Sequence, residues 1–194
     1  RTAVKGWDKL LASHLRPTSD RVREAIFNLL MNGVHGNPVE GARVLDLFAG
    51  TGALGLEALS RGAARVAFVD AGTAARALLR QNIEKMQAMG VTDVWRSDAT
   101  RMGPHRGAGY SLAILAPPYG QGLGERALAS LAEGGWLAPA ALVVWEENTA
   151  PLAPEGFTLL EIVLSLAILA GSLAALGEVM RLGDRNAEIV RDES

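Results

Sequence analysis

Short apolar and β-branched runs alternate with longer segments of helical periodicity between Arg43 and about Glu147. This alternation is typical of βαβ units, in which crossover helices connect parallel strands. It therefore predicts an α/β fold with a mostly parallel, twisted sheet that has helices on both faces. The predicted strands are Val44–Phe48, Val66–Asp70, Asp93–Arg96, Leu112–Leu115 and Leu142–Glu146.

Three helices are predicted around these strands from apolar spacing and end signals. Two of them stop where a glycine can take the positive φ of a C-cap, namely Ala53–Arg61 before Gly62 and Thr73–Met89 before Gly90. The third precedes the first strand and ends near Gly33. It begins at Thr18-Ser19-Asp20, which offers N-cap oxygens, and its apolar residues recur at i, i+4, i+7 and i+8 from Val22.

The composition is that of a folded chain with little scope for thiol or metal chemistry. The 194 residues are 49% apolar and 21% charged, which favours one domain with an appendage and excludes disorder or a disulfide scaffold. The absence of cysteine excludes thiolate zinc sites, iron–sulfur clusters and thiol catalysis. The three histidines are far apart in the sequence, so no metal site is predicted.

The formal net charge of −2 hides an uneven distribution of charge along the chain. Basic residues outnumber acids in residues 1–30, whereas acids outnumber basic residues in 156–194. Three arginines of the first segment are candidates for contacts with RNA phosphates: Arg16, Arg21 and Arg23. The alternative is a solvated helix face on which Arg21 or Arg23 is paired with nearby acids.

The strongest local motif follows the first predicted strand. There the chain runs from Asp46 into a Gly-x-Gly-x-x-Gly turn formed by Gly50, Gly52 and Gly55, and then into a helix. Such a turn lets the backbone approach a nucleotide-like ligand at a helix N-terminus. A carboxylate at Asp46 would repel a pyrophosphate but suits an ammonium group, such as that of the methionine end of S-adenosylmethionine.

Two further acids lie at the ends of the next two predicted strands. Asp70 can accept hydrogen bonds from the two hydroxyls of a ribose, and Asp98 can accept one from an adenine amino group. The carboxyl ends of parallel strands meet at one edge of a sheet, which is where open α/β sheets bind ligands. The alternative is that Asp70 and Asp98 are ordinary turn or N-cap acids.

The fourth predicted strand leads into Ala116-Pro117-Pro118-Tyr119, and here the chain resembles the bacterial 16S ribosomal RNA guanine-N2 methyltransferase family. The resemblance covers about Leu15 to Phe157 and rests on RPTSDRVREAIFN from Arg16, LDLFAGTGALGLEA from Leu45 and PPY from Pro117. It implies a Rossmann-like methyltransferase fold that uses S-adenosylmethionine. The residues expected to bind this cofactor are Asp46, Phe48, Gly50, Gly52, Ala53, Asp70, Asp98 and Ala99.

In that family the fourth strand ends in Asp or Asn before Pro-Pro-Tyr. The acid and the adjacent carbonyl accept the two N–H bonds of an exocyclic amine, and the aromatic ring stacks on the base. Here Ala116 stands in the place of the acid, while Pro117, Pro118 and Tyr119 remain. Groups of this kind are worth roughly 10²–10⁴-fold in rate, so impaired chemistry is predicted.

The resemblance implies methyl transfer to the exocyclic N2 of a guanine in 16S ribosomal RNA, either free or in the small-subunit particle. A cytoplasmic monomer is expected, with no metal. Two alternatives come from other classes of protein. One is a non-catalytic cofactor- or RNA-binding protein, which Ala116 favours, and the other is a pilin-like membrane or assembly subunit.

The pilin-like alternative comes from the C-terminal segment, which departs from the methyltransferase pattern. Gly156-Phe157-Thr158-Leu159-Leu160-Glu161 and the uncharged run Ile162–Gly177 resemble the start of type IV pilins and pseudopilins. One interpretation is a strand, Phe157–Leu160, followed by a buried helix at the edge of the sheet. Another is a helix within 157–177 that inserts into a membrane or binds a partner, and a third is a hybrid chain. The last strand of the family is predicted to be missing or replaced.

The chain is thus expected to have three parts. Residues 1–33 form a basic segment and a helix, residues 34–155 form the cofactor-binding methyltransferase core, and residues 156–194 form an atypical apolar C-terminal segment.

Overall fold

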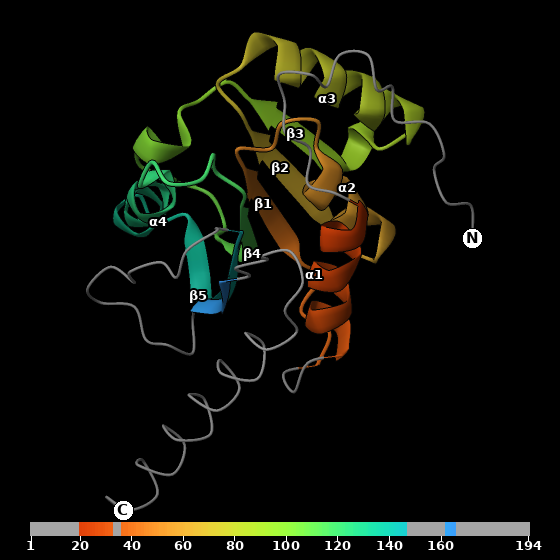
Figure 1. The fold of residues 1–194 in the computed structure, drawn as a ribbon, viewed down its shortest axis with the longest axis horizontal. Helices are drawn as coiled ribbons and strands as arrows, with labels where there is room; N and C mark the ends of the chain where they lie inside the picture. Colours follow the sequence, from red (N-terminus) through yellow and green to blue (C-terminus); the bar gives the residue numbers. More distant parts are fainter. Residues whose placement is uncertain (1–19, 33–35, 147–161, 166–194) are drawn as a thin grey trace, which may run out of the picture.

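The computed structural model describes residues 20–32, 36–146 and 162–165. Their helices and strands are shown in Figure 1. In chain order they are α1 (Asp20–Asn32), β1 (Arg43–Leu47), α2 (Ala53–Ser60), β2 (Arg65–Val69), α3 (Thr73–Lys85), the 3-10 turn η2 (Met89–Val91), β3 (Thr92–Trp95), the 3-10 turn η3 (Ala99–Arg101), β4 (Tyr110–Leu115), α4 (Leu123–Glu133), β5 (Leu137–Trp145) and β6 (Ile162–Ser165).

The six strands of the described residues form one sheet in the order β3-β2-β1-β4-β5-β6. Every neighbouring pair in this sheet is parallel, so the carboxyl ends of the strands lie at one edge. The strand order reverses between β1 and β4, and open α/β sheets bind ligands at the carboxyl edge beside such a reversal. This confirms the predicted fold class and directs attention to the loops after β1, β2, β4 and β5.

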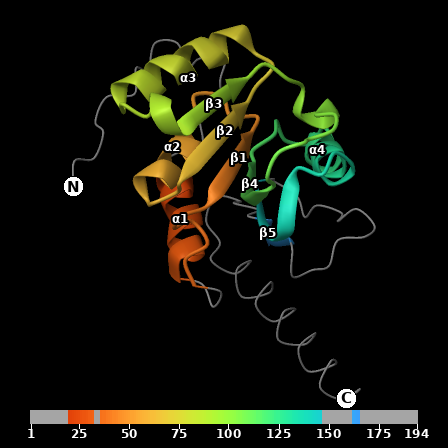
Figure 2. The ribbon, with the colours of Figure 1, turned by 180° about the vertical axis from the view of Figure 1, so that it is seen from behind.

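Helices cover both faces of the sheet, as predicted. On one face the buried side chains of α1, α2 and α3 pack in one core with Val44, Val66 and Ile114. On the other face α4 packs in a second core with Leu45, Leu115 and Trp145. Figures 1 and 2 show this division from opposite sides, with α4 separated from the other three helices by the sheet.

The predicted elements are confirmed with three differences. Helix α3 ends at Lys85 rather than at Met89, because Gln87 takes a left-handed conformation with φ of 54° that stops the helix. Strand β5 begins at Leu137, five residues before the predicted start, and carries an irregularity with φ of 58° at Ala140. Helix α4 was not predicted, although its buried residues Ala127, Leu128 and Leu131 have helical spacing.

The C-terminal segment was expected to contribute a strand at Phe157–Leu160 in one interpretation, and the strand that the structure describes begins two residues after Leu160. Ile162–Ser165 forms β6, which pairs in parallel with β5. The outer edge of β5 offers unpaired backbone groups, and the β-branched Ile162 and Val163 favour the strand that pairs with them. A parallel strand from the C-terminal segment therefore lies beside β5.

Most expectations for this end of the chain lie outside the described residues. These are the strand Phe157–Leu160, the pilin-like sequence that starts at Gly156 and the rest of the run to Gly177. Within the described part of the chain, no helix has both the length and the hydropathy needed to cross a membrane.

Candidate active site

The Gly-rich turn that joins β1 to α2 is packed tightly on one side, and on the other it has few close contacts with the described residues. Gly52 has φ of 82°, and a side chain there would collide with the Leu79 side chain of α3. A side chain at Gly55 would collide with the ring of Phe68 on β2. At Gly50, with φ of 56°, the nearest atom to an added Cβ is 3.9 Å away. The second and third glycines therefore bring α2 close to the sheet, while the first leaves space for a ligand.

The remaining two residues predicted at this turn flank it. Phe48 follows β1 directly and has φ of 58°, an uncommon value for a bulky residue. Such backbone strain is concentrated at functional sites. Ala53 is buried at the start of α2, where the N–H groups of the first helical turn lack partners within the helix.

Asp46 is the penultimate residue of β1, between Phe68 of β2 and Ile114 of β4, and only 1% of it is exposed. Its Oδ2 atom accepts a hydrogen bond of 2.8 Å from the Gly55 N–H, which ties α2 to the strand. Its Oδ1 atom is buried and has no hydrogen-bond partner within the described residues. The carboxylate thus combines a structural contact with a buried acceptor that lacks a donor.

Burial of Asp46 makes its charged form unfavourable. Desolvation raises the pKa of its carboxyl from 3.8 to about 7, the Gly55 N–H opposes that rise, and the negative charge of Asp70 adds to it. A positively charged group beside Oδ1 would stabilise the ionised form. A phosphate there would have the opposite effect on the carboxylate.

Asp70 follows β2 and connects two loops of the site. Its Oδ2 atom accepts the Gly50 N–H at 2.8 Å, and its Oδ1 atom accepts the Gly72 N–H at 2.7 Å. The buried Arg76 of α3 donates from Nη1 to the Asp70 carbonyl oxygen at 2.8 Å. A carboxylate has about four acceptor positions, so these bonds leave Asp70 able to accept from ribose hydroxyls.

Asp98 is exposed and caps η3, after β3. Its Oδ1 atom accepts hydrogen bonds from the Thr100 N–H at 2.9 Å and from the Thr100 hydroxyl at 2.7 Å. These bonds lower the pKa of the Asp98 carboxyl, and the positive charges of Arg101 and Arg126 lower it further. Asp98 is therefore an N-cap acid, the alternative weighed above, and its second oxygen stays available for a ligand. The neighbouring Ala99 is buried in the core under α4.

The Ala116–Tyr119 turn follows β4, beside the end of β1. The Ala116 N–H donates to the Leu47 carbonyl at 3.4 Å, so the position of the missing acid lies next to the start of the Gly-rich turn. Pro117 is buried, Pro118 is exposed and Tyr119 is half-buried. The structure thus brings the Pro-Pro-Tyr sequence to the same edge as the three acids.

Glu146 is a residue of this edge that sequence reasoning missed. It directly follows β5, is 8% exposed and accepts a hydrogen bond of 2.6 Å from the Tyr119 hydroxyl at Oε1. Its backbone N–H donates to the Leu115 carbonyl at 2.8 Å, which continues the pairing of β5 with β4. The signal that could have found it is the one used for Asp70, an acid at the end of a predicted strand.

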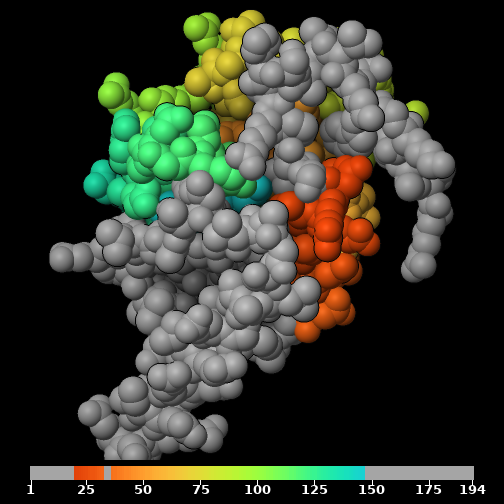
Figure 3. Space-filling view, in the orientation of Figure 1, coloured from red at the N-terminus to blue at the C-terminus, as the bar shows by residue number. Residues whose placement is uncertain are grey.

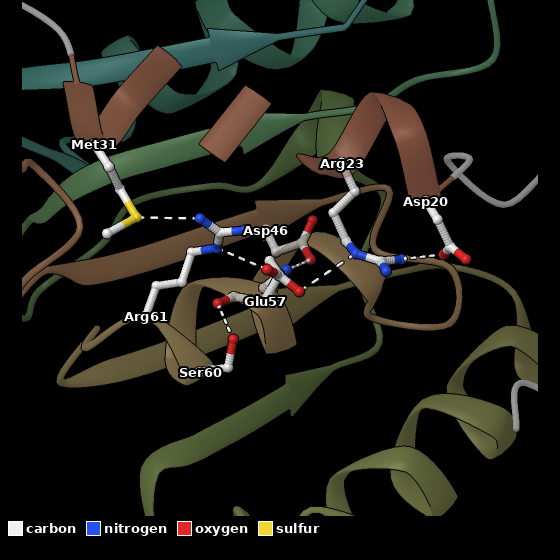
Figure 4. Close-up of polar contacts among 8 residues, drawn as sticks. Asp20, Arg23, Met31, Asp46, Glu57, Ser60 and Arg61 are labelled. Carbon is white, nitrogen blue, oxygen red and sulfur yellow. Dashed lines mark hydrogen bonds and ion pairs between the residues drawn. The ribbon is translucent and has the colours of Figure 1, made fainter. Parts of the chain in front are cut away.

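The predicted RNA-binding arginines have different surroundings. Arg16 lies outside the described residues, and Arg21 is exposed on α1, the helix coloured red in Figure 3. Arg23 forms ion pairs with Asp20, with Nη1 and Oδ1 2.9 Å apart, and with Glu57 of α2, with Nε and Oε2 3.4 Å apart (Figure 4). Arg23 therefore links α1 to α2, and its contact with RNA stays a prediction.

The same network continues along α2. The second oxygen of Glu57 accepts from Arg61 Nε at 2.7 Å, and Arg61 also donates to the Met31 sulfur at 3.2 Å (Figure 4). Within the described part of the chain, no group of three or more His, Asp or Glu side chains is arranged to hold a metal ion.

A family model, curated proteins and solved structures all match this chain. The family model for conserved hypothetical protein 95 matches residues 7–165. The chain is 38% identical over 148 residues to ribosomal RNA small subunit methyltransferase D of Escherichia coli strain K12, which covers 75% of this chain and 72% of that protein. Identity to the Haemophilus influenzae protein of the same name is 37% over 153 residues, 76% of each chain. The solved structure of yhhF from Escherichia coli has a TM-score of 0.64 and 38% identity, and the similarity covers 74% of this chain and 78% of that one.

Proposed function

This chain belongs to the conserved hypothetical protein 95 family, and we propose that it transfers a methyl group from S-adenosylmethionine to the exocyclic N2 of a guanine in 16S ribosomal RNA. The relatives at 37–38% identity are named as ribosomal RNA small subunit methyltransferases. Such relatives, with the fold, make the chain an RNA methyltransferase. The donor, the target atom and the state of the RNA substrate belong to the proposal.

One observation carries the choice of donor, the buried Oδ1 atom of Asp46 without a hydrogen-bond partner among the described residues. A buried acceptor of this kind is costly unless a donor satisfies it. The ammonium group of the methionine part of S-adenosylmethionine would satisfy it and would also compensate the negative charge. A pyrophosphate in the same place would have the opposite effect on Asp46.

The other cofactor contacts follow from the groups at the same edge. Asp70 would accept from the ribose hydroxyls, and Asp98 with Ala99 would hold the adenine. Gly50 and Gly52 give the backbone room to approach the methionine part, between Phe48 and Ala53. When bound, S-adenosylmethionine supplies an electrophilic methyl group.

The target amine would be oriented by the turn after β4. An exocyclic amine on a base ring is a poor nucleophile. As its new N–C bond forms, the bond between the methyl group and the donor sulfur would break with its electron pair left on sulfur, and the amine proton would pass to water. The Pro117 carbonyl would accept one N–H bond, and the Tyr119 ring would stack on the base. Ala116 supplies no second acceptor, so we expect a rate roughly 10²–10⁴-fold below that of a protein with the acid.

The RNA would reach this edge from the side of α1. Arg16, Arg21 and Arg23 are the candidates for phosphate contacts, which fix position without reading sequence. The substrate would be 16S ribosomal RNA or the small-subunit particle, which implies a cytoplasmic location. We expect the protein to act as a monomer.

Methyl transfer from radiolabelled S-adenosylmethionine to unmethylated small subunits and to free 16S ribosomal RNA tests the proposal. Digestion of the RNA to nucleosides then identifies the methylated base. We expect N2-methylguanosine, slowly with this chain and faster by a factor of 10² or more with Ala116→Asp. A different modified nucleoside would contradict the target, and equal rates for both proteins would contradict the role given to Ala116.

Ala116 also favours a second candidate, a non-catalytic protein that binds the cofactor or the RNA. Calorimetric titration with S-adenosylmethionine shows whether the chain binds this cofactor, which the methyltransferase and the non-catalytic cofactor-binding protein both require. Binding without turnover in both Ala116 and Ala116→Asp proteins would support the non-catalytic function. No binding at all would remove both.

A further inference from the structure

The contact between Tyr119 and Glu146 joins two strand ends that are adjacent only in the folded sheet. Leu115 of β4 pairs with Trp145 of β5, so Ala116 and Glu146 occupy the next positions along the two strands. The Glu146 backbone is fixed there by its N–H bond to the Leu115 carbonyl. Its side chain reaches across the end of β4 to the Tyr119 hydroxyl.

The length and burial of this contact make it a strong one. The distance of 2.6 Å between the Tyr119 hydroxyl and Glu146 Oε1 is typical of a hydroxyl that donates to an ionised carboxylate. Glu146 is only 8% exposed, so water competes little for the carboxylate oxygens. Removal of a partner from a buried, charged hydrogen bond is more costly than its net contribution to folding.

The loop that carries Tyr119 is exposed on both sides of this residue. Pro118 is exposed on one side, and Gly120 on the other has φ of 70° and no heavy atom within 4 Å of an added Cβ. The rest of the loop runs over exposed residues to Gly122, where α4 begins. A bond from the tip of the Tyr119 ring to the sheet therefore restricts both side-chain torsions of Tyr119.

We propose that Glu146 is a positioning residue that holds the Tyr119 ring in the orientation needed to stack on the target base. This inference rests on the proposed function for the role of the ring, but the hydrogen bond itself does not. Glu146 acts through Tyr119 rather than on the reacting atoms. Because Ala116 provides no acceptor for the amine, alignment of the base depends more heavily on the ring that Glu146 holds.

Fluorine NMR of protein labelled with 3-fluorotyrosine measures the contact without any assay of activity. The chain has two tyrosines, Tyr110 and Tyr119, so the spectrum has two resonances, and Tyr119→Phe assigns them. In Glu146→Leu we expect the Tyr119 resonance to sharpen and to move toward its position in the unfolded chain. The resonance of the buried Tyr110 reports whether the variant is folded and should stay in place.

A second variant covers the case in which Glu146→Leu does not fold. Glu146→Asp keeps the charge but shortens the side chain by one methylene, so it should also release Tyr119. Glu133→Leu, an exposed position near the end of α4, is the control for removal of a carboxylate. An unchanged Tyr119 resonance in folded Glu146→Leu or Glu146→Asp overturns the inference.

A double-mutant cycle on methyl transfer tests the consequence for catalysis. Tyr119→Phe keeps the ring and removes only the hydroxyl, so it should match Glu146→Leu, each lowering kcat by roughly 10- to 100-fold, the worth of a hydrogen bond to a charged group. The KM for RNA should change little, because phosphate contacts elsewhere dominate affinity. The double variant should be no slower than either single one, and Glu146→Gln, which keeps an acceptor, should recover most of the rate.

The two experiments separate failure of the inference from failure of the proposed function. Losses that multiply in the double variant overturn the inference, because Glu146 would then act independently of the Tyr119 hydroxyl. If neither this chain nor Ala116→Asp methylates RNA, the proposed function fails, and the NMR result alone decides whether Glu146 positions Tyr119.

Discussion

Asp46→Asn should make the protein more stable above neutral pH while it weakens cofactor binding. The carboxyl of Asp46 has a pKa of about 7 in the folded state against 3.8 as its ordinary value. Because the pKa of Asp46 is higher in the folded protein than in the unfolded chain, protonation of this carboxyl stabilises the fold. This contribution to the free energy of unfolding is fully present below about pH 3.8 and is lost as the pH rises to about 7. A difference of about three pKa units corresponds to roughly 4 kcal/mol in the free energy of unfolding.

Asparagine preserves the contact that Asp46 makes and removes the charge. Its carbonyl oxygen can accept the Gly55 N–H, and its amide carries no ionised form to desolvate. The free energy of unfolding of Asp46→Asn minus that of the original protein should therefore grow with pH. Between pH 5 and pH 8 we expect growth of roughly 2–3 kcal/mol, most of it below pH 7.

Urea unfolding of both proteins at pH 5, 6, 7 and 8, without cofactor, measures this difference. Glu133→Gln, on the exposed side of α4, is the matched control for removal of one negative charge. Parallel profiles for Asp46→Asn and the original protein would refute the reasoning, because Asp46 would then ionise in the folded state at no cost. Calorimetry on the same variant should show weaker binding of S-adenosylmethionine, despite the more stable fold.

Two further predictions concern the packing of α2. Gly55→Ala places a methyl group against the ring of Phe68, so the free energy of unfolding should fall by about 1–3 kcal/mol. Urea unfolding measures this change, and a difference smaller than about 0.5 kcal/mol would contradict the close approach of α2 to β2. Arg23→Ala removes the ion pair with Glu57. Both side chains of this pair are partly exposed, so the free energy of unfolding should fall by at most about 1 kcal/mol. If Arg23 also contacts a phosphate, the KM for RNA should rise and its salt dependence should weaken, and an unchanged KM would restrict Arg23 to its structural role.

The parallel sheet and its ligand edge could be predicted because each depends on local patterns. β1 is a short buried run followed by the glycine-rich turn, and β2 is a short buried run followed by an acid. In each case the strand and the feature that follows it lie within a few residues of each other. The start of β5 could not be predicted in the same way. Pro139 lies in that segment and argues against a strand, while the irregularity at Ala140 lets the chain continue beside β4.

The place of each candidate acid in the fold could be predicted from the sequence, whereas most of its contacts could not. Asp70 and Asp98 lie at strand ends, and their bonds to the N–H groups of Gly72 and Thr100 are the local turn and N-cap contacts of the alternative given above. The bond from the Gly50 N–H to Asp70 joins residues 20 positions apart and has no such local signal. The bond from Tyr119 to Glu146 spans 27 residues and exists only because β4 pairs with β5. The pairing of distant strands decides which acids lie together at the carboxyl edge of the sheet. No local pattern in a single sequence indicates this pairing.

The buried charged residues of the described chain lie where burial lowers the stability of the fold. They are three in number, Asp46, Arg76 and Glu146, and each acts on the same edge of the sheet. Asp46 lies under the Gly-rich turn, Arg76 holds the backbone of Asp70, and Glu146 holds Tyr119. Apolar residues of similar volume would stabilise such positions more than buried charges do. Their concentration at one edge is what we expect of an edge that binds the proposed cationic cofactor on one side and the proposed target base on the other.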